Sequence, residues 1–104
     1  MADATIVDPL GRRIVLHDAT WYAHVLRNHR ELAPHRSVAE AAIASPIEIR
    51  HSKSDPDCRL FYGTGPRPAV MMVVVANVVN GFVKTAYQVK KFAEGSIEWS
   101  KPTQ

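Results

Sequence analysis

The sequence predicts a single α+β domain in which an N-terminal hairpin and two helices precede a four-stranded antiparallel sheet packed on the helices. Three patterns predict it: an amphipathic stretch over 21–31, a capped stretch from Ser37, and alternating or apolar stretches from Ile47 onward. The chain has 104 residues, which is the length of one domain, so we expect residues 1–104 to share one core. Its hydrophobic content of 46% and charged content of 22% are typical of folded proteins.

The first element is expected to be a β-hairpin. Ile6-Val7 and Ile14-Val15-Leu16 flank the segment Asp8-Pro9-Leu10-Gly11. Proline presets φ at the second turn position, aspartate bonds the turn backbone, and glycine relaxes the exit, so this segment favours a tight turn.

A helix is predicted from about Trp21 to Asn28 or Glu31, with Asp18 or Thr20 as its N-cap. On a wheel of about 100° per residue, the apolar side chains and His29 share one arc. The apolar members of that arc are Trp21, Tyr22, Val25 and Leu26. The opposite, polar side carries His24, Arg27, Asn28 and Glu31. The two histidines are therefore expected on different faces of the helix.

A shorter second helix is predicted from Ser37. Glu40 stands three residues later, which is the spacing of a capping box, and Pro46 ends the helix by about Ser45.

The remaining chain is predicted to form strands at 47–52, 59–62, 70–79 and 82–89. Asn80-Gly81 favours a two-residue hairpin that pairs Val79 with Phe82. This register places Thr85 and Tyr87 on the apolar face that receives the helices, unless a bulge inverts part of the assignment. Lys84 and Lys90 are expected on the opposite face. Arg50 alternates outward on its strand.

Composition and motifs exclude several classes of site. The single cysteine, Cys58, precludes an internal disulfide or a cysteine-rich zinc site. The chain shows no glycine-rich phosphate loop, no Gly-x-Ser-x-Gly and no Cys-x-x-Cys. His24 and His29 are five residues apart and lack the i, i+4 spacing of a helical zinc pair. We therefore expect no metal and no cofactor.

Charge and hydropathy suggest where the protein works and what it binds. The net charge of +3 is compatible with a polyanionic partner, although its scattered basic residues also fit an ordinary solvated surface. The apolar stretch 69–79 is too short to span a bilayer, and the first residues lack the pattern of a secretory signal. A cytoplasmic protein without a membrane segment is expected.

The available side chains suit RNA transesterification. In this reaction a base removes the proton of a 2′-hydroxyl, that oxygen attacks the adjacent phosphorus, and an acid protonates the departing 5′ oxygen. Histidine fits either role because its ordinary pKa is near 6.5, and cationic or hydroxyl donors stabilise the charge on phosphate.

Two segments carry a family resemblance. They are Trp21-Tyr-Ala-His24-Val-Leu-Arg27-Asn-His29-Arg30-Glu31 and Val83-Lys-Thr85-Ala-Tyr87. Over about residues 14–89 the chain resembles the phage-associated nuclease domains of the barnase/EndoU/colicin/RelE-like (BECR-fold) superfamily, with Pro46 and Ile49 also in place. It departs from the family pattern at Asn28, where the family has arginine, and at Arg30, where it has proline.

The resemblance implies an endoribonuclease with His24 and His29 as the acid/base pair, and with Thr85 and Tyr87 contacting phosphate or leaving group. Arg27 or Arg30 would supply the cation that Asn28 lacks. Arg50, Lys84 and Lys90 are further candidates for contacts with RNA. A toxin or phage-associated effector of this kind would also have an antitoxin or immunity protein, acidic on its binding face.

Structural roles compete with these assignments. A histidine on an apolar arc is often a core residue, and threonine and tyrosine are favoured in strands for packing alone. The alternative function is therefore an inactive RNA- or protein-binding module on the same scaffold, and a third is a small metabolic or structural domain.

Overall fold

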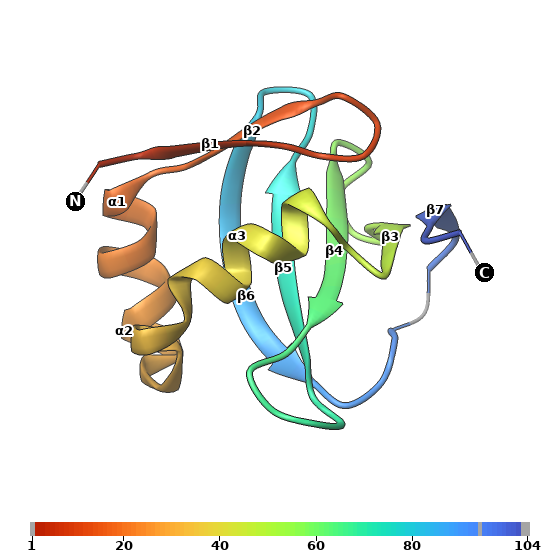
Figure 1. Cartoon of the computed structure of the whole chain (residues 1–104). Helices are drawn as coiled ribbons and strands as arrows, with labels where there is room; N and C mark the ends of the chain where they lie inside the picture. The colour runs from red at the N-terminus through yellow and green to blue at the C-terminus, as the bar shows by residue number, and fades with distance from the viewer. Residues whose placement is uncertain (1, 94, 103–104) are drawn as a thin grey trace.

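One curled sheet of seven strands organises the computed structural model, which describes residues 2–93 and 95–102 (Figure 1). The strands are β1 (Ala4–Val7), β2 (Arg13–Leu16), β3 (Glu48–His51), β4 (Cys58–Thr64), β5 (Met71–Asn77), β6 (Phe82–Val89) and β7 (Ile97–Ser100). Their order across the sheet is β1-β2-β6-β5-β4-β3-β7. Neighbours are antiparallel except β2 and β6, which are parallel and pair at Val15 and Phe82.

The α+β class is confirmed, and the four predicted strands, β3 to β6, are present and antiparallel to their neighbours, but the sheet extends beyond them to seven strands. The hairpin β1–β2 joins the sheet through β6, which makes the sheet mixed. The strand β7 was not predicted, and it pairs with β3 at the far edge. Both differences are long-range pairings, which no local sequence pattern specifies.

The helical part has two arms. The first contains α1 (Asp18–Thr20), the π-helical turn η1 (Trp21–Val25) and α2 (Leu26–Asn28), and it lies beside β6 (Figure 1). A 3-10 helix, η2 (Arg30–His35), connects it to α3 (Arg36–Ala44), which crosses the sheet over β4 and β5. The predicted helices are thus present, with the first one irregular.

The capping box predicted at Ser37 does not form. The helix α3 begins one residue earlier, and its N-cap, His35, makes no side-chain capping bond. Glu40 instead accepts a hydrogen bond from Arg36, whose buried guanidinium also donates to Asp18 and to the Leu16 carbonyl. These bonds tie the start of α3 to the first arm. The helix ends at Ala44, as Pro46 predicted.

The predicted register of the β5–β6 hairpin was wrong. Asn77, not Val79, is opposite Phe82, because the Asn77 carboxamide accepts bonds from the backbone of Val79 and Asn80 and widens the turn. A bulge between Val75 and Ala76 then shifts the pairing again.

The core lies between the helices and one face of the sheet. Its largest members from the helical part are Trp21, Val25, Leu32 and Ile43, and the sheet contributes Ile14, Leu16, Ile49, Phe61, Met72 and Val74. The helix α3 approaches β4 closely at Gly63, where a Cβ atom would lie 2.6 Å from the Cα and Cβ of Ala42. Tyr22, expected in the apolar arc of the first helix, is exposed.

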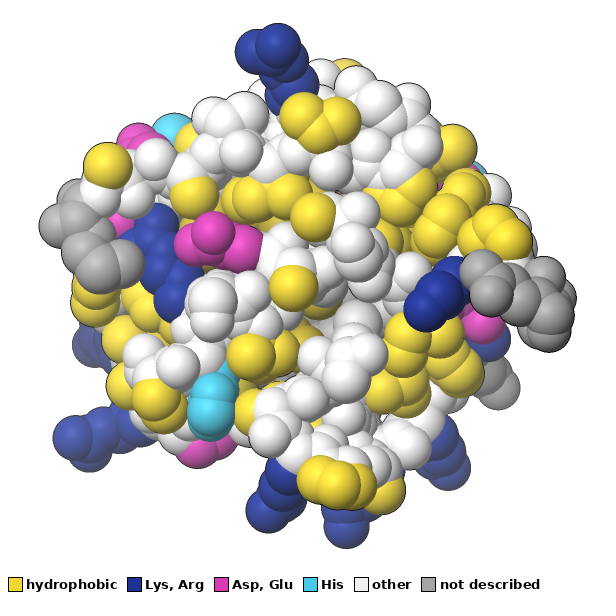
Figure 2. Space-filling view, viewed as in Figure 1, with side chains coloured by type: hydrophobic (Ala, Val, Ile, Leu, Met, Phe, Trp, Pro, Cys, Tyr) yellow, Lys and Arg dark blue, Asp and Glu magenta, His cyan; other side chains and the backbone are white. Residues whose placement is uncertain are grey.

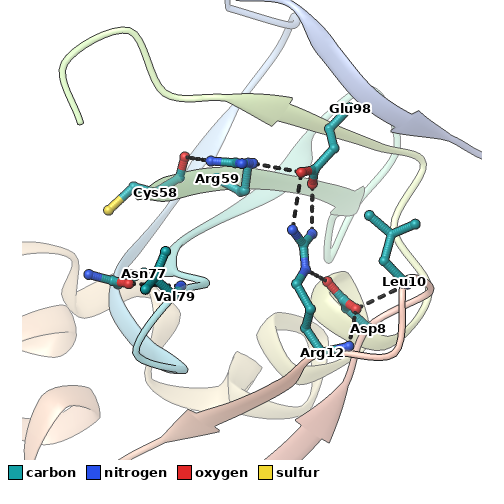
Figure 3. A network of polar contacts seen from close by, with 8 residues as sticks. All are labelled: Asp8, Leu10, Arg12, Cys58, Arg59, Asn77, Val79 and Glu98. Atoms are coloured by element: carbon teal, nitrogen blue, oxygen red, sulfur yellow. Dashed lines mark hydrogen bonds and ion pairs between the residues drawn. The ribbon is translucent and has the colours of Figure 1, made fainter. Parts of the chain in front are cut away.

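A polar network connects the N-terminal hairpin to the far edge of the sheet (Figure 3). Arg12 donates to buried Asp8 at 2.8 Å and to both carboxylate oxygens of Glu98 at 2.7 and 3.1 Å. Glu98 also accepts from Arg59 of β4 at 2.8 Å. Side chains therefore connect the two edges of the curled sheet. Among the described residues, no strand pairing connects these edges.

Candidate nucleic-acid site beside strand β6

The first arm, which carries the two predicted catalytic histidines, contains a π turn. The Leu26 amide bonds to the Trp21 carbonyl, an i→i+5 bond that takes one more residue than an α-helical turn. In a regular α-helix, residues five apart differ by about 140° in direction. His29, with φ −139° and ψ 72°, departs from helical geometry, although its amide still donates to the Val25 carbonyl. A helical wheel therefore does not describe the position of His29.

His24 lies at a hollow between the first arm and β6. The hollow has a volume of about 460 Å³ and is lined by Thr20, His24, Val75, Phe82, Val83, Lys84 and Thr85. His24 is exposed, so its imidazole is accessible to a ligand in this hollow. The structure thus brings together three of the predicted residues: His24, Lys84 and Thr85.

His29 lies beside Tyr87. The ring centroids are 6.1 Å apart, and the ring planes are inclined at 37°. The His29 Nδ1 atom is 3.8 Å from a carboxylate oxygen of Glu31, close enough for an ion pair when the imidazole is protonated. The His29 side chain is 35% exposed, so it is neither sealed in the core nor fully solvated.

Thr85 and Tyr87 do not lie on the helix-covered face, as the predicted register had placed them. They are opposite Val75 and Val73, whereas the core residues Ala86 and Val83 are opposite Val74 and Ala76. The bulge produces this inversion. The first arm stands at the edge of β6, and from there both histidines approach the outer face of the strand.

The hydroxyl of Tyr87 is held in its neutral form. Burial raises its pKa above the ordinary value, and the neighbouring Tyr62 contributes in the same direction. A phenol with a raised pKa keeps its proton at neutral pH and donates a hydrogen bond. Tyr87 is therefore suited to bind an anionic oxygen.

Lys84 carries the positive charge of this hollow. Its Nζ atom is 3.8 Å from a carboxylate oxygen of Asp55, and both side chains are substantially exposed. Such an exposed pair is weak and leaves the ammonium accessible to another anion.

The other predicted arginines do not line the hollow at His24. Arg27 and Arg30 are exposed at the end of the first arm, and Asn28 donates its amide to the His24 carbonyl at 2.9 Å. Arg50 donates to Glu48 and to the Ala93 carbonyl, and its guanidinium lies 5.0 Å from the centre of the Phe92 ring. It therefore connects β3 to the segment after β6 through its Nε and Nη1 atoms.

A second hollow near the end of β6 contains residues that the sequence did not suggest. Two overlapping cavities of about 230 and 300 Å³ share Glu31, Arg67 and Gln88, and they add Lys90 in one case and His35 in the other. The signal in the sequence was slight: Arg67 is a cation between two prolines in a turn segment. Of the predicted residues only Lys90 lies here.

The cationic side chains are distributed around the molecule. On the face covered by α3, hydrophobic side chains occupy much of the centre, and most Lys and Arg side chains lie toward the margin (Figure 2). This distribution agrees with the sequence, in which basic residues form no continuous tract.

Within residues 2–93 and 95–102, no group of three or more His, Cys, Asp and Glu side chains is arranged to hold a metal ion. Over the same residues no helix has the length and apolar character needed to cross a membrane. In comparisons with known proteins, no family model matches the chain, and neither does any curated protein or solved structure.

Proposed function

We propose that this protein is an endoribonuclease that cleaves RNA by metal-independent transesterification, with His24 and His29 as its acid/base pair. The observation that carries the proposal is that both imidazoles lie beside β6, His24 in the hollow with Lys84 and Thr85 and His29 with its ring centroid 6.1 Å from that of Tyr87. The first arm also contains a π turn, a feature that occurs frequently at functional sites.

The proposed reaction uses the side chains along β6. One histidine accepts the proton of the 2′-hydroxyl as that oxygen bonds to the adjacent phosphorus. The bond from phosphorus to the 5′ oxygen breaks, the other histidine protonates that oxygen, and a 2′,3′-cyclic phosphate remains. Lys84, Thr85 and the neutral Tyr87 hydroxyl supply donors to the phosphate oxygens, where negative charge develops.

The two proton transfers determine how far each histidine substitution should lower the rate of RNA cleavage. Each acid or base contributes about 10²- to 10⁴-fold to the rate. Incubation of the purified protein with total RNA in EDTA should therefore give cleavage that His24→Ala and His29→Ala each reduce by at least about 10²-fold. Lys101→Ala, an exposed substitution in the segment after β7, is the matched control and should cut RNA like the parent protein.

The products provide a second check on the chemistry. Transesterification leaves cyclic phosphate ends, which resist phosphatase until acid opens the ring. Intact RNA, or cleavage insensitive to both histidine substitutions, would exclude the proposal.

A second candidate function is favoured by Asn28. Its side chain is used to bond the His24 carbonyl, so this position provides no cation to the site. An inactive domain that retains RNA on Lys84 and its neighbours would bind RNA with strong salt dependence and leave it uncut. The digest in EDTA, combined with a binding measurement, separates the two. The phage-associated role, the antitoxin and the cytoplasmic location stay predictions from the sequence.

A further inference from the structure

We infer that the hollow lined by Arg67, His35, Lys90, Gln88 and Glu31 is a second phosphate subsite, which holds the RNA strand next to the nucleotide at His24 and His29. The inference rests on the proposed function, because it assigns a second contact to the same RNA substrate. None of the sequence patterns pointed to Arg67, His35 or Gln88 as binding residues. We call this hollow the Arg67 subsite.

The Arg67 subsite adjoins the histidine site. Glu31 lines both of its overlapping cavities, and the same carboxylate is 3.8 Å from His29. Gln88, which lines both cavities as well, directly follows Tyr87 on β6. Successive side chains of a strand point to opposite faces, so Gln88 reaches the Arg67 subsite from the face opposite Tyr87, and Glu31 is the residue that connects the two sites.

Charge in the Arg67 subsite favours an anion. Arg67 and Lys90 are permanent cations, and His35 adds a third positive charge when it is protonated. The opposing carboxylate, Glu31, is already within ion-pair distance of His29. Within the part of the chain that the structure describes, Arg67 makes no hydrogen bond or ion pair through its side chain, so its donors are available. A guanidinium binds two phosphate oxygens at once.

The turn that carries Arg67 is held in one conformation. The Gly65 amide donates to the Val70 carbonyl at 3.0 Å, and the Val70 amide donates to the Arg67 carbonyl at 3.4 Å. A Cβ atom at Gly65 would lie 2.1 Å from the Val70 oxygen, so this turn requires glycine. Ala69 has φ +66°, a left-handed conformation unusual for a residue with a side chain. A fixed turn loses little entropy when Arg67 binds an anion.

Binding of an oligonucleotide that cannot be cleaved tests the inference. We would titrate a fluorescein-labelled 2′-O-methyl RNA of ten nucleotides with the parent protein and with Arg67→Ala, at several salt concentrations. A single lost phosphate contact should reduce the slope of log K against log[salt] by about 0.7. It should also weaken binding at low salt by about tenfold. Lys101→Ala is the control for a lost surface charge and should leave both quantities unchanged.

A second variant separates charge from geometry. Arg67→Lys should keep the salt slope of the parent but bind several-fold more weakly, because lysine does not contact two oxygens in the guanidinium geometry. Arg67→Lys also keeps the inference testable if Arg67→Ala disturbs the turn. A lowered melting temperature of Arg67→Ala would report that disturbance. Equal slopes and affinities for the parent and both variants would overturn the inference, and so would failure of the parent to bind the oligonucleotide.

The outcomes distinguish this inference from the proposed activity. RNA that stays intact in the digest, combined with a reduced slope for Arg67→Ala, would remove the nuclease and keep the subsite. Histidine-dependent cleavage with an unaltered slope for Arg67→Ala would keep the nuclease and remove the subsite.

Discussion

The His29 imidazole and the Tyr87 ring lie 6.1 Å apart between centroids, and this contact joins the end of the first helical arm to β6. It connects residues that are far apart in the sequence and gives the imidazole a fixed neighbour. The tyrosine offers two separable features, an aromatic ring against His29 and a neutral hydroxyl whose pKa burial raises further.

Tyr87→Phe should separate these features. The ring remains, so the free energy of unfolding should change by no more than about 1 kcal/mol, the value of one hydrogen bond. RNA cleavage should fall by about 10- to 10²-fold, since one donor to the phosphate is lost. Tyr22→Phe, at an exposed tyrosine of the first arm, is the control. Activity equal to that of the parent would show that the hydroxyl does not act on the substrate.

Glu98→Gln should destabilise the protein by about 1–3 kcal/mol at neutral pH, because Glu98 accepts charged hydrogen bonds from Arg12 and Arg59. Burial raises the pKa of Glu98, but the bonds from the two arginines outweigh it, and the net pKa is lowered. A lowered pKa gives stability that is present above the unfolded-state value and is lost as the pH falls through the folded-state value.

The effect of Glu98→Gln should therefore shrink below about pH 4, near the ordinary pKa of glutamate. Urea unfolding at several pH values measures it. Asp57→Asn, at an exposed carboxylate, is the control and should change stability by less than about 0.5 kcal/mol. A difference between parent and Glu98→Gln that stays constant from neutral to acid pH would contradict this account.

Gly63→Ala should destabilise the protein by about 1–3 kcal/mol, because the added methyl would lie 2.6 Å from the backbone of α3 at Ala42. The helix has to move away from β4 to accept it. Thermal unfolding measures the loss. Thr64→Ala, at the next and exposed position of β4, should have a much smaller effect. Equal melting temperatures for the two variants would mean that α3 is free to shift.

Cys58 should react slowly with iodoacetamide in the folded protein. The thiol is 1% exposed, and burial, together with a hydrogen bond to Asp55, raises its pKa. Both effects reduce the amount of accessible thiolate, which is the reactive form. In concentrated urea the reaction should become fast, and mass spectrometry follows both rates. Fast labelling of the native protein would show that the end of β4 opens readily.

The sequence indicated the local elements well because each has a local cause. Proline and glycine placed the first turn, and Pro46 placed the end of α3. The bounds predicted for β6, 82–89, agree with the strand Phe82–Val89. What failed was the pairing between elements. The Asn77 side chain widened a turn that Asn80-Gly81 had suggested would be tight, and the bulge between Val75 and Ala76 then reversed the faces assigned to Thr85 and Tyr87.

The candidate site was predicted in part. Five of the predicted residues lie along β6: His24, His29, Lys84, Thr85 and Tyr87. Thr85 and Tyr87 are on the opposite face of the sheet from the one predicted. A helical wheel assumes a constant 3.6 residues per turn, and it does not apply to His29, which departs from helical geometry at the end of the first arm. Arg50 was expected to face solvent, but it donates to the Ala93 carbonyl in the segment after β6. The sequence did not predict this bond because it did not predict the path of that segment. Arg67 was overlooked since its turn lies far in sequence from the helical motif.

The position of Glu98 has a consequence for how the chain folds during synthesis. Arg12 precedes Glu98 by 86 residues, so the ribosome releases the hairpin long before the carboxylate that binds it. Until then Arg12 has only Asp8 as a carboxylate partner, and Arg59 lacks the carboxylate of Glu98. We expect the nascent chain to stay open along this side, and the sheet to curl into its final shape after translation has passed β7.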